Sequence, residues 1–204
     1  MSQTTDKKQQ AKWERRYVDK KTPWDRGGAS PALEKMLSKI PEPPSNVLVP
    51  ACGRGHEVIS LAALGFNVTG VDFAPSAIHD LKHRLTRKNL IATLIDTDLF
   101  VWEPSESFDV IYEQTALCAL NPDLWPEYAR RLHQWMRPGG ILVGMFMQTN
   151  RDGGPPWHVS LTALQGLFPE ALWSWSDNLN EIINHPSGLQ ERFITLKRQD
   201  WLEI

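Results

Sequence analysis

The chain has 204 residues, of which 41% are hydrophobic, and this is enough apolar material for the core of one ordinary domain. Its formal net charge of -2 provides no large basic field, so we expect neither a nucleic-acid partner nor a membrane-surface partner. No apolar run approaches the roughly 20 residues that span a bilayer, and the opening MSQTTDKKQQ lacks the apolar core of a secretory signal. We therefore expect a cytoplasmic protein.

The first 28 residues are mostly polar or charged and contain three aromatic side chains. Residues 1–10 are polar and predict a disordered tail, and residues 11–204 then form one domain. Within residues 11–45, Trp13 and Tyr17 are spaced i, i+4 and share a helix face, and Trp24 follows in a charged loop. A second helix is predicted to start at Ser30, as its N-cap, and to end at the prolines of 41–44.

Strand and helix patterns alternate along the rest of the chain. This alternation predicts an α/β fold with a mostly parallel sheet and helices on both faces. We expect a seven-stranded sheet, with six parallel strands and an antiparallel hairpin from the last two segments. The strands are predicted at residues 46–49, 67–72, 91–95, 108–112, 140–146, 172–178 and 191–198, and the helices at 56–64, 76–88, 123–136 and 161–168.

A glycine pair follows the first predicted strand. In a parallel sheet, ligands bind outside the carboxyl ends of the strands, and Gly53 and Gly55 allow a ligand to approach the backbone there. Asp72 ends the next strand, where a carboxylate can accept hydrogen bonds from both ribose hydroxyls. This spacing suits an adenosine cofactor but does not by itself separate a nicotinamide dinucleotide from S-adenosylmethionine.

Further features favour S-adenosylmethionine over the dinucleotide. The dinucleotide motif needs a third glycine where this chain has Val58. After the third strand, Asp98 can accept a hydrogen bond from an adenine amine while Leu99 packs on the ring, although a solvated turn aspartate is an equally good interpretation. The chain also has no second catalytic domain, which suits methyl transfer at the rim of the cofactor domain.

Several segments together resemble a known family. VLVPACGRGHE, VTGVDFAPSAI, FDVIYEQTALCAL, YARRLHQWMRPGGILV and GGPPWHVS are similar to class I S-adenosylmethionine-dependent methyltransferases of the thiopurine methyltransferase superfamily. The resemblance runs from Trp13 to Arg198, and TPWD is nearest to the thiol, thiocyanate and halide branch. It implies a Rossmann-like methyltransferase fold in which the N-terminal aromatic segment covers the cofactor and S-adenosylhomocysteine is the product. The residues implied to surround the cofactor are Trp13, Tyr17, Trp24, Gly53, Gly55, Asp72, Phe73, Asp98, Leu99, Gln114 and Thr115.

The chain departs from the family pattern near the expected acceptor. Many members carry an arginine shortly after NP, and this chain has Trp125 there. Arg130 or Arg131, one to two turns later on the helix, can replace it, and a solvated or helix-dipole role is the alternative for both. We predict that Trp24, Trp125 and Trp157 contact a small nucleophile, and that the reaction is S-methylation of sulfide or methanethiol, with halides as further acceptors. Thiopurines, tellurite or selenite, oxygen or nitrogen acceptors, and a non-catalytic cofactor-binding module remain alternatives.

A general base is not required for a thiol that is partly ionised near neutrality. If one is used, the candidates near the rim are His158, Glu113 and Asp25. No cluster of His, Cys, Asp or Glu has metal-ligand spacing, so we predict no metal. We expect a monomer.

Overall fold

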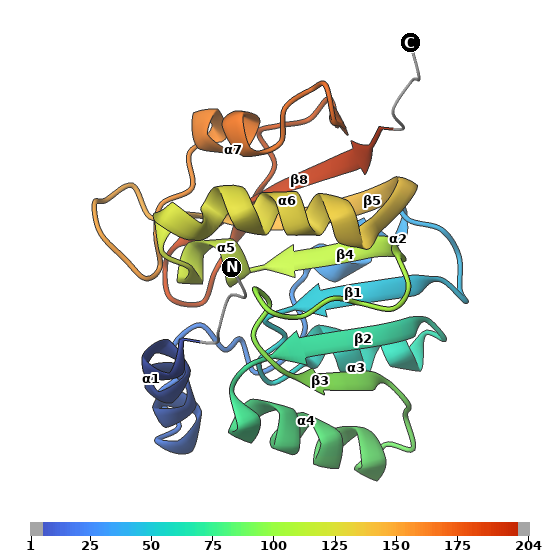
Figure 1. The fold of residues 1–204 in the computed structure, drawn as a ribbon, viewed down its shortest axis with the longest axis vertical. Helices are drawn as coiled ribbons and strands as arrows, with labels where there is room; N and C mark the ends of the chain where they lie inside the picture. The colour runs from blue at the N-terminus through green and yellow to red at the C-terminus, as the bar shows by residue number, and fades with distance from the viewer. Residues whose placement is uncertain (1–5, 200–204) are drawn as a thin grey trace.

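The computed structural model describes residues 6–199. Its strands form one eight-stranded sheet in the order β3-β2-β1-β4-β5-β8-β6, and β7 pairs with β8 (Figure 1). The elements are α1 (Lys7–Val18), α2 (Ala32–Leu37), β1 (Asn46–Pro50), α3 (His56–Ala63), β2 (Asn67–Asp72), α4 (Pro75–Arg87), β3 (Thr93–Asp96), β4 (Phe108–Gln114), α5 (Ala116–Ala119), the 3-10 turn η1 (Pro122–Leu124), α6 (Trp125–Trp135), β5 (Met136–Gln148), α7 (Leu161–Leu167), β6 (Trp173–Trp175), β7 (Ile182–Asn184) and β8 (Gln190–Arg198).

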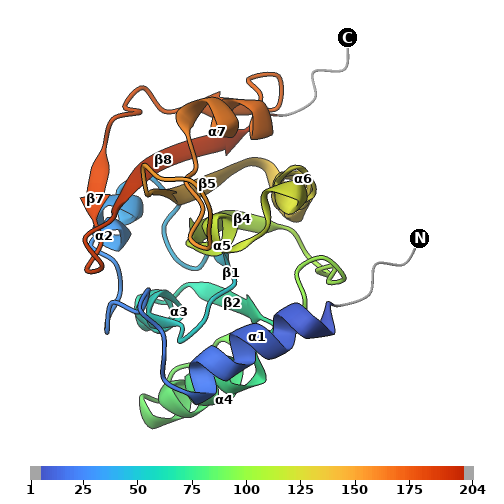
Figure 2. The ribbon, with the colours of Figure 1, turned by 90° about the vertical axis from the view of Figure 1, so that its left-hand side faces the viewer.

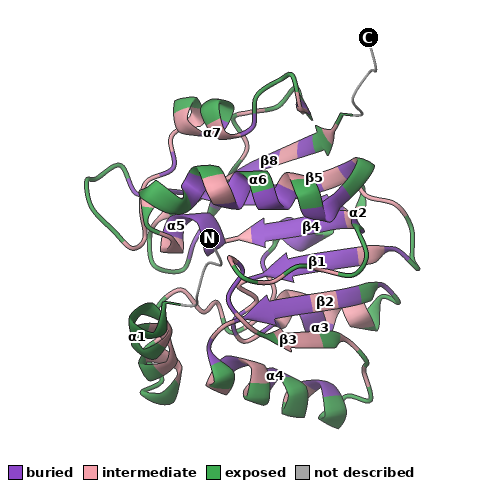
Figure 3. Cartoon of the chain, viewed as in Figure 1, coloured by how far each residue is buried: buried purple, intermediate pink, exposed green. Residues whose placement is uncertain are grey.

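The strands β3, β2, β1, β4 and β5 are parallel, and their side chains alternate between two cores. Val47 and Val49 of β1 pack with α2, α3 and α4, whereas Leu48 packs on the other face with α5, α6 and α7. The purple strands between partly green helices in Figure 3 show this burial. The α/β class with a mostly parallel sheet, covered on both faces, is confirmed.

The end of the sheet differs from the prediction in its strand count. β8 is antiparallel to β5, and β6 pairs antiparallel with β8, which agrees with the hairpin expected from the last two segments. β7 is an additional strand that pairs with Glu191 and its neighbours in β8. We missed β7 because it has three residues and only Ile183 among them is buried, too few to show a period of two.

The N-terminal helix begins earlier than predicted. α1 starts at Lys7, so residues 7–10 are helical and not a disordered tail; residues 1–5 lie outside the described part. The Asp6 carboxylate caps the helix by accepting the N–H groups of Lys8 and Gln9 at 3.0 and 3.1 Å. α1 lies beside α4 in both views (Figure 2).

Two side chains of α1 dock the helix at the start of α4. The Gln10 amide donates to the Phe73 carbonyl at 2.8 Å, and the Glu14 carboxylate accepts the Ser76 backbone N–H at 3.0 Å. A carboxylate at the first turn of α4 also interacts favourably with the helix dipole. α1 is thereby held at the carboxyl ends of the parallel strands. Between residues 6 and 199, no helix combines the length and apolar character needed to cross a membrane.

Candidate active site

The loop after β1 depends on its two glycines. Gly53 and Gly55 have φ values of 52° and 63°, in the left-handed region that favours glycine. A Cβ on Gly55 would lie 2.3 Å from Cδ2 of Leu81, so this turn also needs the space that glycine leaves. α3 begins directly after the loop, at His56. Its first backbone N–H groups therefore lie at the carboxyl edge of the sheet, where they can bind a polar ligand.

The Asp72 carboxylate, at the end of β2, holds this loop in place. One oxygen accepts the Gly53 N–H at 2.8 Å and the other accepts the Ala74 N–H at 2.9 Å. The residue is 5% exposed, and this burial raises the pKa of Asp72 to about 6. Each oxygen accepts one of these bonds and keeps a second lone pair, which leaves acceptor capacity for the two hydroxyls of a ribose.

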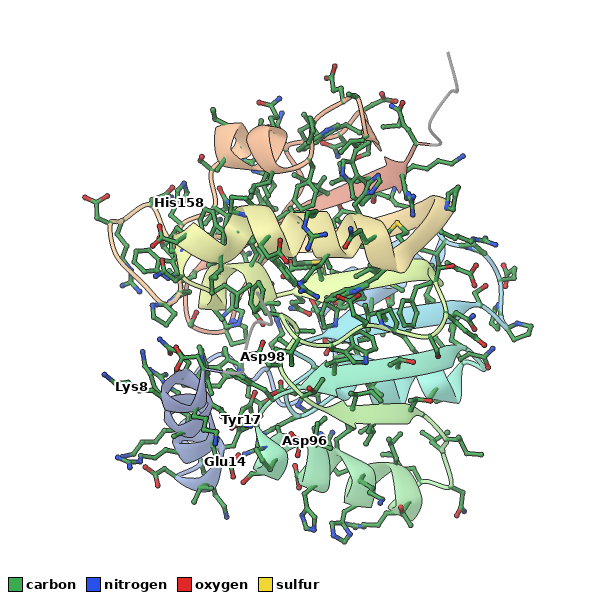
Figure 4. All side chains as sticks on the ribbon, viewed as in Figure 1. Lys8, Glu14, Tyr17, Asp96, Asp98 and His158 are labelled. Carbon is green, nitrogen blue, oxygen red and sulfur yellow. The ribbon has the colours of Figure 1, made fainter. Side chains whose placement is uncertain are left out.

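The third predicted position follows β3. Asp98 is buried and accepts the Phe100 N–H at 2.9 Å, and Leu99 beside it is also buried. Figure 4 shows Asp96 and Asp98 at the end of the sheet that faces α1. Burial, with Glu14 nearby, raises the pKa of Asp96. Gly53 and Asp98 thus follow β1 and β3, and Asp72 ends β2, so the three residues lie at the ends of neighbouring strands.

The aromatic side chains predicted to cover the cofactor, Trp13, Tyr17 and Trp24, form a lid on the loop that contains Gly53 and Gly55 (the glycine loop). The rings of Trp13 and Tyr17 both meet Trp24 edge to face, with centroids 5.3 and 6.0 Å apart. The Tyr17 hydroxyl lies 2.7 Å from where a Cβ on Gly53 would be, so a larger residue at position 53 would displace the Tyr17 side chain. Burial, with Asp72 as a close negative neighbour, raises the pKa of Tyr17 and keeps its hydroxyl protonated. The Arg16 guanidinium packs over the two tryptophan rings.

Asp25 fastens the lid segment to the glycine loop. Its carboxylate accepts the Gly27 N–H at 2.8 Å, contacts His56 Nε2 at 2.9 Å and pairs with Arg54 Nε at 3.0 Å. Burial raises the pKa of Asp25, but the hydrogen bonds from Gly27 and His56 outweigh it, and the net shift is downward. These contacts favour a positioning role over the predicted role as a base.

A polar cluster at the end of β4 joins Gln114, which was predicted near the cofactor, to Glu191, Arg26 and His185, which were not predicted. The Gln114 amide contacts Glu191 at 3.3 Å and its carbonyl accepts the Tyr112 hydroxyl at 2.9 Å. Glu191 is fully buried and forms an ion pair with Arg26. His185 is also buried and donates from Nε2 to the Trp24 carbonyl at 3.2 Å. The one available sequence signal was the position of Glu191, two residues before Phe193 on the inward face of β8.

Glu113 is enclosed beneath this edge. One of its oxygens accepts the Leu117 N–H at the start of α5, at 2.7 Å, and the other has no partner among the described residues. Burial raises the pKa of Glu113 to about 8, so the carboxyl group is mostly protonated at pH 7. A protonated carboxyl group cannot accept a proton from a substrate, which favours a structural role for Glu113. Thr115, which lies between Glu113 and Leu117 in the chain, has a backbone φ of 65°.

His158, the third base candidate, organises the loop after β5. Its Nδ1 accepts the backbone N–H groups of Thr149 and Asn150, both at 3.2 Å. Because two N–H donors face Nδ1, the neutral ring carries its proton on Nε2. The atom that would act as a base is thus already used as an acceptor.

The predicted acceptor tryptophans lie in different surroundings. Trp24 belongs to the lid, whereas Trp125 is buried in the core around α6 and donates from Nε1 to the Leu117 carbonyl at 2.9 Å. Trp157 is half-buried and packs against the same core. The placement of Trp125 favours a packing role. Arg130 and Arg131 both pair with Glu127, so neither replaces the absent family arginine as a free cation.

A groove of about 1130 Å³ lies elsewhere, along α6, and none of the predicted cofactor or catalytic residues lines it. Between residues 6 and 199, no three His, Cys, Asp or Glu side chains are grouped to hold a metal ion.

A parallel α/β sheet with a glycine loop after β1 and a buried aspartate at the end of β2 has the form of an adenosine-cofactor site. A family model described as Thiopurine S-methyltransferase (TPMT) matches residues 8–197. The chain therefore belongs to this family and is an S-adenosylmethionine-dependent S-methyltransferase. The predicted family, enzyme class and cofactor are confirmed.

Relatives with known names agree with this assignment. Thiocyanate methyltransferase 1 of Brassica oleracea is 32% identical over 159 residues, which cover 76% of this chain and 70% of the relative. Probable thiol methyltransferase 2 of Arabidopsis thaliana is 35% identical over 153 residues, with coverages of 74% and 68%. The solved 1,6-didemethyltoxoflavin-N1-methyltransferase of Burkholderia thailandensis has a TM-score of 0.76 at 20% identity, with coverages of 94% and 87%, and shows the same fold.

The raised pKa of Asp72 predicts pH-dependent cofactor binding. Above pH 6 the carboxylate is ionised and can accept from both ribose hydroxyls, whereas below pH 6 it is increasingly protonated. With a pKa of about 6, we expect S-adenosylhomocysteine to bind about tenfold more weakly at pH 5 than at pH 7, measured by calorimetry. In Asp72→Asn this dependence should disappear. If the affinity for S-adenosylhomocysteine changes equally with pH in the wild type and in Asp72→Asn, a group other than Asp72 titrates.

The buried Glu113 predicts a different pH effect, on stability. Its folded-state pKa is raised, so stability is lost as pH rises from the unfolded pKa near 4.5 to about 8 and then stays level. Glutamine does not ionise, so the stability of Glu113→Gln should not fall with pH for this reason. We expect its free energy of unfolding, from urea denaturation, to exceed that of the wild type by about 2 kcal/mol or more at pH 8, and by little at pH 5. A constant difference across this range would contradict a buried, protonated Glu113.

Proposed function

We propose that the chain transfers the methyl group of S-adenosylmethionine to the sulfur of a small thiol such as sulfide or methanethiol, with halides as further acceptors. The observation that carries the proposal is the lid: Trp13, Tyr17 and Trp24 meet on the glycine loop, beside the position expected for the sulfonium. Aromatic faces attract a cation, by about 1 kcal/mol or more when water is excluded. The same rings restrict the space to a small acceptor.

The order of the strands sets the direction of the cofactor. Asp98 follows β3, Asp72 ends β2 and Gly53 follows β1, so we expect adenine, ribose and methionine to extend along the sheet toward β4. The methyl group then faces the ends of β4, β5 and β8. An acceptor held there is aligned for in-line displacement, which needs approach and exclusion of water more than it needs functional groups.

The three base candidates support a reaction without a general base. Asp25 is occupied by three donors, Glu113 is enclosed, and Nδ1 of His158 accepts two backbone N–H groups. A thiol that is partly ionised near neutrality, or a halide, reacts without one. The names of the thiol and thiocyanate methyltransferases among the relatives point to the same kind of acceptor. The cytoplasmic location, the monomeric state and the lack of a nucleic-acid partner stay predictions.

The test is the production of S-adenosylhomocysteine by the purified protein with sulfide, methanethiol, a longer thiol, iodide, a thiopurine and tellurite, each supplied separately, with volatile products collected. We expect turnover on sulfide or methanethiol, giving methanethiol or dimethyl sulfide. Asp72→Ala serves as the control for cofactor-dependent turnover, and its cofactor affinity should fall by about 1 to 3 kcal/mol. Turnover only on the thiopurine or tellurite would replace the proposal by that alternative, and none on this panel would direct the search to oxygen and nitrogen acceptors.

A further inference from the structure

The acceptor position proposed above adjoins one buried cation. Arg26 follows the lid tryptophan Trp24, and its side chain is only 9% exposed. It forms an ion pair with Glu191, which is fully buried at the start of β8, and donates from one terminal nitrogen to the Asn184 carbonyl at 3.0 Å. Glu191 also contacts Gln114 at the end of β4. The guanidinium therefore lies against the end of β7 and the start of β8, and Glu191 links it to the end of β4, the edge that the proposed methyl position faces.

The donors of this guanidinium are incompletely used. Arginine has five N–H groups, and among the described residues Asn184 and Glu191 accept one each. The Nε atom is buried and has no partner within residues 6–199. A buried N–H group without a partner costs about 1 to 3 kcal/mol, and each terminal nitrogen of Arg26 keeps one further N–H group that an anion can accept.

We propose that Arg26 selects the acceptor by its charge, and that the preferred acceptor is a small anion: hydrosulfide, a thiolate, thiocyanate or a halide. The inference rests on the proposed function and deepens it. In the transfer, a lone pair of the anion forms the bond to the methyl carbon, and the carbon–sulfur bond of the sulfonium breaks with its electron pair going to sulfur. The products are a neutral methylated acceptor and neutral S-adenosylhomocysteine at that sulfur.

Glu191 reduces the electrostatic attraction of Arg26 for a bound anion. A fully unpaired guanidinium in a buried site would hold an anion tightly and reduce its reactivity, whereas the Glu191 carboxylate neutralises most of that charge. The remaining N–H groups still provide direction to the bound anion. Arg26 thus orients the nucleophile, and Glu191 with Gln114 positions Arg26.

The competing explanation is that the Arg26–Glu191 ion pair only holds the lid against β8. The two explanations differ in whether the effect of an Arg26 substitution depends on the charge of the acceptor. The experiment compares thiocyanate with thiourea, a small neutral sulfur nucleophile, in the wild type and in Arg26→Gln. In Arg26→Gln we expect kcat/KM for thiocyanate to fall about tenfold or more relative to the wild type. The kcat/KM for thiourea should change less than about threefold. If thiourea is not methylated, its inhibition constant against thiocyanate takes that place. S-adenosylhomocysteine affinity, by calorimetry, should stay within about twofold.

Two further variants complete the design. Arg26→Lys keeps the charge without the planar fork, and it should recover part of the loss with thiocyanate. Arg130→Gln, an exposed arginine paired with Glu127 on α6, is the matched control and should leave both constants unchanged. If Arg26→Gln does not fold, Arg26→Met, which keeps the apolar stem of the side chain without its charge, replaces it in the same comparison.

The outcomes are distinguishable. Equal losses for thiocyanate and thiourea in Arg26→Gln, or no loss for either, would overturn the role of Arg26 while the proposed function stands. A wild-type protein that methylates thiourea but no anion would overturn the selection of anions. A wild-type protein that turns over no sulfur or halide acceptor would instead remove the proposed function, on which this inference depends.

Discussion

The acceptance of two backbone N–H groups by one buried carboxylate, Asp72, is the interaction on which the rest of the edge depends. It joins the turn after β1 to the turn after β2, and so sets where α3 and α4 begin. The parallel sheet requires such an arrangement, because all its strands end at one edge with backbone groups that no neighbouring strand can satisfy. An acidic side chain at this point orders the glycine loop and keeps acceptor capacity for a ribose.

The N-terminal segment is held against this edge by charged contacts with distant parts of the chain. Glu14 caps α4, Asp25 contacts the glycine loop through His56 and Arg54, and Arg26 pairs with Glu191 on β8. These contacts lie on either side of the lid aromatics. A chain segment with few buried residues is thus positioned by ion pairs and hydrogen bonds, and a site that must admit and release ligands gains from contacts of modest individual strength.

The sequence could predict those features that depend on residues close together in the chain. Gly53 needs positive φ, Asp72 ends an apolar run, and Trp13 and Tyr17 share a helix face; each of these was readable from a few residues. Arg26 and Glu191 were missed because their pairing joins positions 165 residues apart, and α5 was missed because four residues show no helical period. Trp125 was expected near the acceptor, but its burial depends on how α5 and α6 pack, which a single segment does not show.

The most direct test of this account is a crystal structure of the protein with S-adenosylhomocysteine and thiocyanate. The account predicts adenine beside Asp98 and Leu99, both ribose hydroxyls on Asp72, the homocysteine sulfur facing the end of β4, and thiocyanate on the N–H groups of Arg26. A cofactor bound away from Asp72 would contradict the arrangement of the site. Thiocyanate held by other groups, with Arg26 contacting only Glu191 and Asn184, would contradict the selection of the acceptor by charge.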